Sequence, residues 1–262
     1  MFPYITIFGK QITLYMIMAL IGMFVAGLFA IKLVKENKKD TNEFIEVMLI
    51  SAIGLFFGAH ILYGITNIDV LIKLLTHFNK LTSFKEFVDV FIYIFGGAVF
   101  YGGLIGALIV GYIYVKKKKL DSKFYFDVAA IITPLFHFFA RIGCFLSGCC
   151  YGVESHIGFT YKHSLVELAN GVNRFPIQLV ESLYNLLLFI FLYLLYKKDK
   201  FKGKLIYLYL ILYPIGRFIF EFFRGDEYRG FIFGISTSQF ISIILLLFSL
   251  TSLIIKRKKD TN

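Results

Sequence analysis

Residues 12–33, ITLYMIMALIGMFVAGLFAIKL, form an apolar run that leads directly into the lysine-rich stretch KLVKENKK at residues 32–39. A helix needs roughly 20 apolar residues to cross the hydrocarbon core of a membrane, so this run is long enough to span it. Because the run is long and ends in lysines, we interpret it as a retained span and not as a cleaved signal peptide.

The composition agrees with a membrane protein. Hydrophobic residues make up 58% of the 262-residue chain, and the mean hydropathy is +0.74. Soluble domains usually contain about 45–50% apolar residues, so the excess requires an apolar solvent. The net charge is +11, but the lysines lie in short clusters between apolar runs. This placement indicates signals for membrane orientation, and we expect no nucleic-acid partner.

Six further apolar runs follow the first. Helix is the structure expected for them, since an open strand in lipid would leave its backbone groups unpaired. The sequence therefore predicts an all-α, polytopic membrane protein of about seven transmembrane helices, with residues 1–262 forming a single transmembrane domain. The predicted spans cover residues 12–33, 46–65, 98–115, 126–145, 179–196, 205–222 and 231–255.

The lysine clusters predict how these spans are oriented. They lie at residues 32–39, 116–119, 197–204 and 256–259, after the first, third, fifth and seventh spans. Cytoplasmic loops are enriched in Lys and Arg, so the clusters place the N-terminus outside and the C-terminus in the cytoplasm. Two long segments would then face outside. Residues 66–95 carry apolar side chains at helical spacing, which is typical of an interfacial amphipathic helix, and residues 146–176 form an external loop.

Ionisable residues within the spans are candidates for a functional site, because they are costly in a membrane. Tyr213, Arg217 and Glu221 follow at intervals of four and share one face of the sixth span. Arg141 lies near the outer end of the fourth span, and Arg224 lies at the outer boundary of the sixth. The alternatives are a structural ion pair between Arg217 and Glu221, and arginines that extend to the membrane interface.

Two arginines on different spans suit an anionic ligand. The planar guanidinium group of Arg141 or Arg217 can bind a phosphate through two hydrogen bonds. A phospholipid headgroup in the outer leaflet is the natural partner. Gly102 and Gly103 lie in a glycine-rich segment that either permits close helix packing or admits part of such a lipid. His137 lies four residues before Arg141 and shares its helix face.

The three cysteines, Cys144, Cys149 and Cys150, lie close together in sequence. They do not form a CxxC pair, so no metal site is expected, and the sequence shows no fingerprint for another cofactor. Cys149 or Cys150 is a possible covalent nucleophile. The alternative is that all three pack as small apolar residues.

Five further segments, with the opening FGKQITLYMIMALIGMFVAG, occur in the order found in one enzyme family. They are GAHILYG at residues 58–64, GGAVFYGGLIGALIVG at 96–111, PLFHFFARIGCFLSGCCYG at 134–152, PIQLVES at 176–182 and YPIGRFIFEFFRGD at 213–226. In these segments the chain resembles the prolipoprotein diacylglyceryl transferases over nearly its whole length. The family's usual residues are present at Arg141, Gly143, Gly148, Gly152, Tyr213, Arg217, Glu221 and Arg224.

The chain departs from the family pattern at several positions. His60 stands where an arginine is usual, and Tyr101 replaces a functionally important histidine. Cys144 replaces an asparagine, Cys149 replaces an acidic residue, and Val153 replaces an arginine. The sequence therefore resembles a divergent branch of the family.

The resemblance implies a bacterial cell-membrane enzyme that moves the diacylglyceryl group of phosphatidylglycerol onto the lipobox cysteine of a prolipoprotein, the first step of lipoprotein maturation. Its partners would be phosphatidylglycerol, the prolipoprotein signal peptide and the lipid bilayer. The implied catalytic residues are Arg141, Arg217, Tyr101, His137 and Glu221, and the implied substrate-binding residues are Gly102, Gly103, Gly143, Gly152, Tyr213 and Arg224. The alternatives are transfer to a different acceptor and non-catalytic binding or transport of phospholipid.

Overall fold

The computed structural model describes residues 3–76, 83–226, 230–232 and 234–261. These residues are mostly helical, as the apolar runs predict. They fall into two compact units. The first comprises Met1–Asn37 and Lys123–Asn262, and the second comprises Lys38–Ser122.

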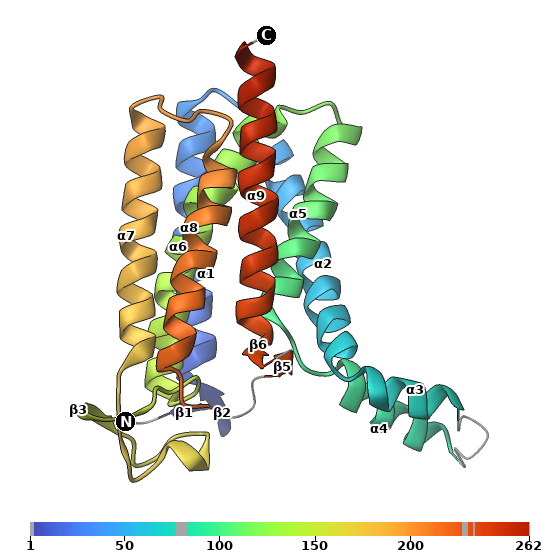
Figure 1. Cartoon of the computed structure of the whole chain (residues 1–262), viewed down its shortest axis with the longest axis vertical. Helices are drawn as coiled ribbons and strands as arrows, with labels where there is room; N and C mark the ends of the chain where they lie inside the picture. Colours follow the sequence, from blue (N-terminus) through green and yellow to red (C-terminus); the bar gives the residue numbers. More distant parts are fainter. Residues whose placement is uncertain (1–2, 77–82, 227–229, 233, 262) are drawn as a thin grey trace. The chain divides into compact units, whose positions relative to one another are not determined.

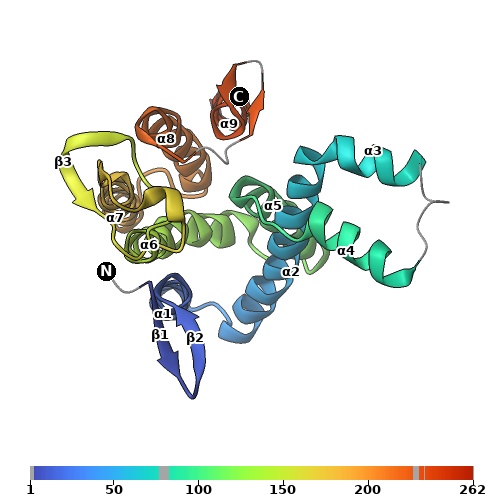
Figure 2. The same cartoon turned by 90° about the horizontal axis from the view of Figure 1, so that it is seen from below.

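The first unit contains five long helices that run side by side (Figures 1 and 2). The N-terminus of the first of them is capped by Thr13, whose hydroxyl accepts a hydrogen bond from the backbone N–H of Met16. Two of the helices contain a proline, at Pro134 and Pro214. The helices are α1 (Leu14–Glu36), α6 (Ser122–Ser147), α7 (Ile177–Lys197), α8 (Leu205–Phe220) and α9 (Thr237–Thr261).

Polar contacts at the ends of these helices show which of them run in the same direction. Lys197, in the last turn of α7, pairs with Glu36 at the end of α1 at 2.8 Å. Asp127, near the start of α6, accepts a hydrogen bond from the backbone N–H of Leu205 at the start of α8, at 2.9 Å. The lysine clusters that follow α1 and α7 therefore lie at the same end of the unit, which agrees with the predicted topology.

The opposite end of the first unit carries short antiparallel strand pairs (Figure 1). There Tyr15 of α1 donates its backbone N–H to Ser147 Oγ of α6 at 3.0 Å. Within the predicted external loop, Arg174 is buried and places its guanidinium 4.3 Å from the centre of the Tyr151 ring. The strand pairs are β1 (Tyr4–Ile7) with β2 (Lys10–Thr13), β3 (Glu154–Thr160) with β4 (Asn173–Arg174), and β5 (Phe231–Ile232) with β6 (Ile235–Ser236), and two 3-10 turns, η2 (Glu167–Ala169) and η3 (Glu221–Phe223), complete the unit.

The second unit is organised by close packing of α2 (Thr41–Thr66) against α5 (Phe100–Lys117). Glycines make this approach possible. A Cβ atom on Gly58 would lie 2.3 Å from the carbonyl oxygen of Gly102, and one on Gly106 would lie 2.2 Å from that of Gly54. These glycines therefore act as helix-contact residues, which is the packing role that the sequence left open for this segment.

Six described helices are long and apolar enough to cross a membrane: α1, α2, α6, α7, α8 with η3, and α9. The prediction of about seven spans is confirmed when α4 (Phe84–Phe95) and α5 are counted together as one bent span, with an angle of 88° between them. The protein is thus a multi-pass membrane protein.

Two boundaries differ from the prediction. The seventh span begins at Thr237 and not at residue 231, because the β5–β6 pair occupies the start of that segment. The amphipathic segment 66–95 contains two helices, α3 (Ile68–Thr76) and α4, and residues 77–82 between them lie outside the described residues. Apolar residues at helical spacing indicated an amphipathic helix there, and the periodicity alone does not reveal a break.

We expect Gly106→Ala to lower the unfolding temperature, because its methyl group would overlap the backbone of α2. Overpacking of this kind costs about 1–3 kcal/mol. The matched control is Gly27→Ala on α1, where no atom lies within 4 Å of the new Cβ. This control should be neutral or slightly stabilising, since alanine favours helix. Thermal unfolding in detergent measures both, and equal effects would contradict the proposed packing.

Candidate functional site

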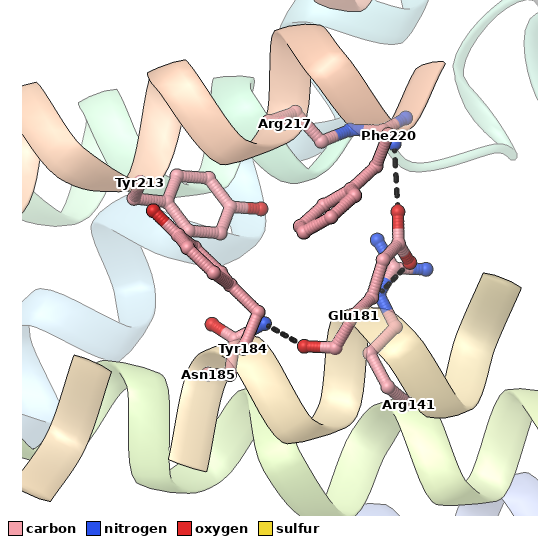
Figure 3. Close-up of a pocket in the computed structure, with 7 residues that line it drawn as sticks. All are labelled: Arg141, Glu181, Tyr184, Asn185, Tyr213, Arg217 and Phe220. Carbon is pink, nitrogen blue, oxygen red and sulfur yellow. Dashed lines mark hydrogen bonds and ion pairs between the residues drawn. The ribbon is translucent and has the colours of Figure 1, made fainter. Parts of the chain in front are cut away.

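The centre of the candidate site is one carboxylate held between two guanidinium groups (Figure 3). Glu181 lies in α7, and its two oxygens contact Arg141 of α6 and Arg217 of α8. The distances are 2.8 Å from Oε2 to Arg141 Nε and 3.0 Å from Oε1 to Arg217 Nη1. The Glu181 side chain is only 3% exposed. The two arginines that the sequence placed on separate spans therefore contact one carboxylate, which a third helix supplies.

Arg217 is held from a second side as well. Its Nη2 lies 2.6 Å from Oε2 of Glu221 and donates a hydrogen bond to Ser238 Oγ of α9 at 3.1 Å. The ion pair between Arg217 and Glu221, which the sequence left as an alternative, is therefore present, but it is one part of a network that joins four helices. Glu221 itself opens the η3 turn, just after α8 ends.

A pocket adjoins this network. It contains about 210 Å³ of free space, part of which is open to the surroundings. Charged groups lie on one side of it and aromatic rings on the other, which suits a ligand with a phosphate and an apolar portion. The lining residues are Arg141, Glu181, Tyr184, Asn185, Tyr213, Arg217 and Phe220 (Figure 3).

His137 is not among the residues that line the pocket. Its ring stacks on that of Tyr213, with 5.3 Å between the ring centres, and Tyr213 stacks in turn on Tyr209 at 5.4 Å. Asn185 also interacts with His137. His137 thus supports the Tyr213 ring from behind, and its contacts favour positioning over direct contact with a ligand.

Arg141 keeps hydrogen-bonding capacity for a ligand. Its Nε is used by Glu181, and its Nη1 makes a long contact of 3.9 Å with the sulfur of Cys144. Within the described part of the chain, its Nη2 has no hydrogen-bond partner. The Arg141 side chain is 18% exposed, twice the fraction of Arg217. Arg141 is therefore the more accessible of the two guanidinium groups.

Arg224 lies close to this network in sequence but is paired locally. Its Nε and Nη2 bind the carboxylate of Asp226 at 2.8 and 2.5 Å. Its backbone pairs with Gly152, where a Cβ atom would lie 2.1 Å from the carbonyl oxygen of Phe175. The resemblance implied that Gly152 binds substrate. The structure places Gly152 in a close backbone contact that only glycine permits.

The three cysteines gather beside Arg141. Their sulfur atoms all lie within 4.8 Å of one another. Hydrogen bonds from the thiols of Cys144 and Cys149 lower the pKa of Cys150, and the positive charge of Arg224 lowers it further. Hydrogen bonds with Cys144 and Cys150 raise the pKa of Cys149. Cys150 is therefore the better thiolate of the two nucleophiles that the sequence considered.

Other predicted residues lie elsewhere. Tyr101, Gly102 and Gly103 lie in the first turn of α5, in the second unit. Gly143 lies where α6 meets α1, and a Cβ atom there would lie 3.0 Å from the Cα of Tyr15. The structure thus gives Gly143 a packing role.

The sequence did not identify Glu181 as a site residue, although it is the central one. Its signal was present, because Glu181 is an ionisable residue within an apolar span. Ser238 and Asn185 carried no such signal, since neutral polar residues are common in membrane helices. Only the packing of α7 and α9 against α8 shows that these residues belong to the site.

Known proteins resemble this chain over nearly its whole length. The family model described as prolipoprotein diacylglyceryl transferase matches residues 3–255. The chain belongs to this family. The resemblance drawn from the motifs is therefore confirmed over nearly the whole chain.

Relatives within the prolipoprotein diacylglyceryl transferase family have similar lengths. A phosphatidylglycerol–prolipoprotein diacylglyceryl transferase from Clostridium tetani is 32% identical over 92% of this chain and 92% of its own. The transferase numbered 2 from Clostridium perfringens is 33% identical, over 92% and 90%. The transferase from Campylobacter hominis is 33% identical, over 95% and 88%.

We expect Glu181→Ala to destabilise this family member strongly, because it leaves two buried guanidinium groups without their shared counter-ion. Removing one partner of a buried ion pair typically costs about 3–5 kcal/mol. The matched control is Glu36→Ala, which removes an exposed carboxylate that also pairs with a cation on another helix at 2.8 Å. Such exposed pairs contribute little, so the control should unfold at nearly the wild-type temperature.

Thermal unfolding in detergent compares the two variants. If Glu181→Ala and Glu36→Ala unfolded at the same temperature, the central role given to Glu181 would be wrong. A Glu181→Gln variant keeps the shape of the side chain and should lie between Glu181→Ala and the wild type.

Proposed function

We propose that the chain transfers the diacylglyceryl group of phosphatidylglycerol to the lipobox cysteine of a prolipoprotein. Membership of the prolipoprotein diacylglyceryl transferase family supports the reaction, and the names of the relatives identify both substrates. The observation that carries the proposal is the pair of guanidinium groups, Arg141 and Arg217, at one pocket with Glu181 between them.

The two arginines suit the phosphate of the lipid. Arg141 offers the N–H groups that Glu181 does not use, and Arg217 adds a second positive charge on the next wall of the pocket. Glu181, Glu221 and Ser238 hold the two guanidinium groups in place before the lipid arrives. Preorganised charge of this kind acts strongly in a site from which water is largely excluded.

In the proposed reaction, the thiolate of the acceptor cysteine attacks the glycerol carbon that carries the phosphate ester. A carbon–sulfur bond forms, the carbon–oxygen bond breaks, and glycerol phosphate leaves with the electron pair on its oxygen. Arg141 and Arg217 stabilise the negative charge that gathers on the departing phosphate. The proton of the thiol passes to a base, and no external oxidant or cofactor takes part.

The topology supports a site that faces the outside of the cell. The lysine clusters predict a cytoplasmic end for the helices, and the site residues Arg141, Glu181 and Arg217 lie toward the other end, where the strand pairs are. We propose that the N-terminus lies outside a bacterial cell membrane and the C-terminus in the cytoplasm. A prolipoprotein whose signal peptide spans the bilayer would then present its cysteine at the level of the site.

We expect Arg141→Lys and Arg217→Lys each to lower the rate of transfer by about 10²–10³-fold, because lysine keeps the charge but loses the planar pair of donors. The assay mixes the purified chain with labelled phosphatidylglycerol and a lipobox peptide, and measures label on the peptide. Lys197→Ala is the control, since Lys197 makes an exposed ion pair at the other end of α7 and should leave the rate unchanged.

Two outcomes would contradict the proposed function. Release of glycerol phosphate without labelled peptide would indicate a different acceptor. Movement of intact lipid between vesicles without any turnover would indicate a transport protein.

Tyr101 allows a separate test of which residue accepts the proton of the acceptor thiol. It stands where the family usually carries a histidine, and a phenol with a pKa near ~10 is a poor base at neutral pH. We expect Tyr101→His to raise the rate of peptide labelling, with Tyr101→Phe as the control that lacks any base at this position. A Tyr101→His variant no faster than Tyr101→Phe would exclude a base at residue 101.

A further inference from the structure

The three cysteines are brought together by a turn at the end of α6. Cys144 lies in the last turns of the helix, and the backbone N–H of Cys149 donates to the carbonyl oxygen of Cys144 at 3.2 Å. Gly148 and Cys150 both adopt positive φ angles, of 73° and 53°. Ser164 fixes the turn by donating its hydroxyl to the carbonyl oxygen of Gly148 at 3.0 Å. The backbone thus returns Cys149 and Cys150 over Cys144.

The resulting sulfur cluster has dimensions close to those of a thiolate metal site. All three cysteines have free thiols, and their sulfurs lie within 4.8 Å of one another. A metal ion with three metal–sulfur bonds of ~2.3 Å needs sulfurs about 4 Å apart, so small side-chain rotations are enough. Cys149 and Cys150 are adjacent, which disfavours a disulfide between them.

The charges around the cluster favour bound thiolates. Arg141 Nη1 lies 3.9 Å from the sulfur of Cys144, and the positive charge of Arg224 acts on Cys150. Three thiolates with one monovalent cation carry two net negative charges. Arg141 and Arg224 also pair with Glu181 and Asp226, so their positive charges offset this charge only in part. Cys144 is buried and the other two thiols are half-buried, so a small ion can still reach them.

We propose that Cys144, Cys149 and Cys150 bind a single soft, monovalent metal ion of the Cu(I) class. Soft thiolate ligands select such ions. In the described residues, the group contains three sulfurs and no histidine or carboxylate, whereas structural zinc sites usually have four ligands. Binding releases the thiol protons to solvent and requires no redox step. The proposal does not depend on the transfer reaction.

The test titrates Cu(I) into the full-length chain, purified in detergent without oxygen, against a chromophoric Cu(I) chelator. We expect one Cu(I) per chain and an ultraviolet charge-transfer band from thiolate to metal. Cys144→Ser, Cys149→Ser and Cys150→Ser should each weaken binding at least tenfold, and the triple variant should lose the band. His156→Ala and His163→Ala remove exposed histidines of the segment that follows the cysteines and should bind as the wild type does.

X-ray absorption of the copper-loaded wild type is a second measurement, which does not depend on how well the variants fold. Three sulfur neighbours at ~2.3 Å would support the proposal. Nitrogen or oxygen neighbours, or undiminished binding by the triple variant, would overturn it. Tighter binding of Zn(II) than of Cu(I) would also overturn the assignment to a monovalent ion.

Discussion

The carboxylate of Glu181 is the interaction on which the site depends. Two guanidinium groups that face one pocket in a membrane protein would repel each other and would be costly to bury. Glu181 lies 2.8 Å from one and 3.0 Å from the other, and so makes their approach possible. The arrangement also fixes both groups in position, which is what a phosphate-binding site requires. Stability and the proposed function therefore rest on the same contact.

Residues from several helices hold the side chains around Glu181 in position. Tyr213 and Arg217, which share one face of α8, line the pocket with an aromatic ring and a guanidinium group. Glu221 follows four residues after Arg217 and pairs with it. Ser238 of α9 holds Arg217 from behind, and His137 of α6 stacks on Tyr213. Lys197 at the end of α7 pairs with Glu36 at the end of α1, so these two helices run in the same direction.

Two of the departures that the resemblance suggested, Cys144 and Cys149, lie at one turn at the end of α6. An acidic residue at position 149 would place a negative charge near Arg141, and an asparagine at position 144 would offer it an amide oxygen. Here both positions carry a thiol, which is apolar and weakly hydrogen-bonding until it ionises. The third thiol, Cys150, completes a cluster whose sulfurs lie within 4.8 Å of one another. The neighbourhood of Arg141 therefore differs chemically from that expected for the family, while the contact with Glu181 remains.

The sequence by itself predicted about seven spans, which is confirmed, because apolar length acts locally along the chain; the orientation drawn from the lysines stays a prediction. It also placed Arg141 and Arg217 on separate helices and paired Arg217 with Glu221, since a spacing of four residues decides which side chains share a helix face. It could not show the angle of 88° between α4 and α5. Nor could it show that the β5–β6 pair precedes α9, or that Gly106 packs against the backbone of Gly54.

Only the tertiary structure decided that Glu181 lies between the arginines and that Ser238 binds Arg217. It also decided that the sulfurs of the three cysteines lie close together. These contacts join residues that are distant in sequence or separated by a turn, and they depend on how each helix is rotated about its axis. An apolar span has no strong polar face to fix that rotation in advance, so it is set by packing against neighbouring helices.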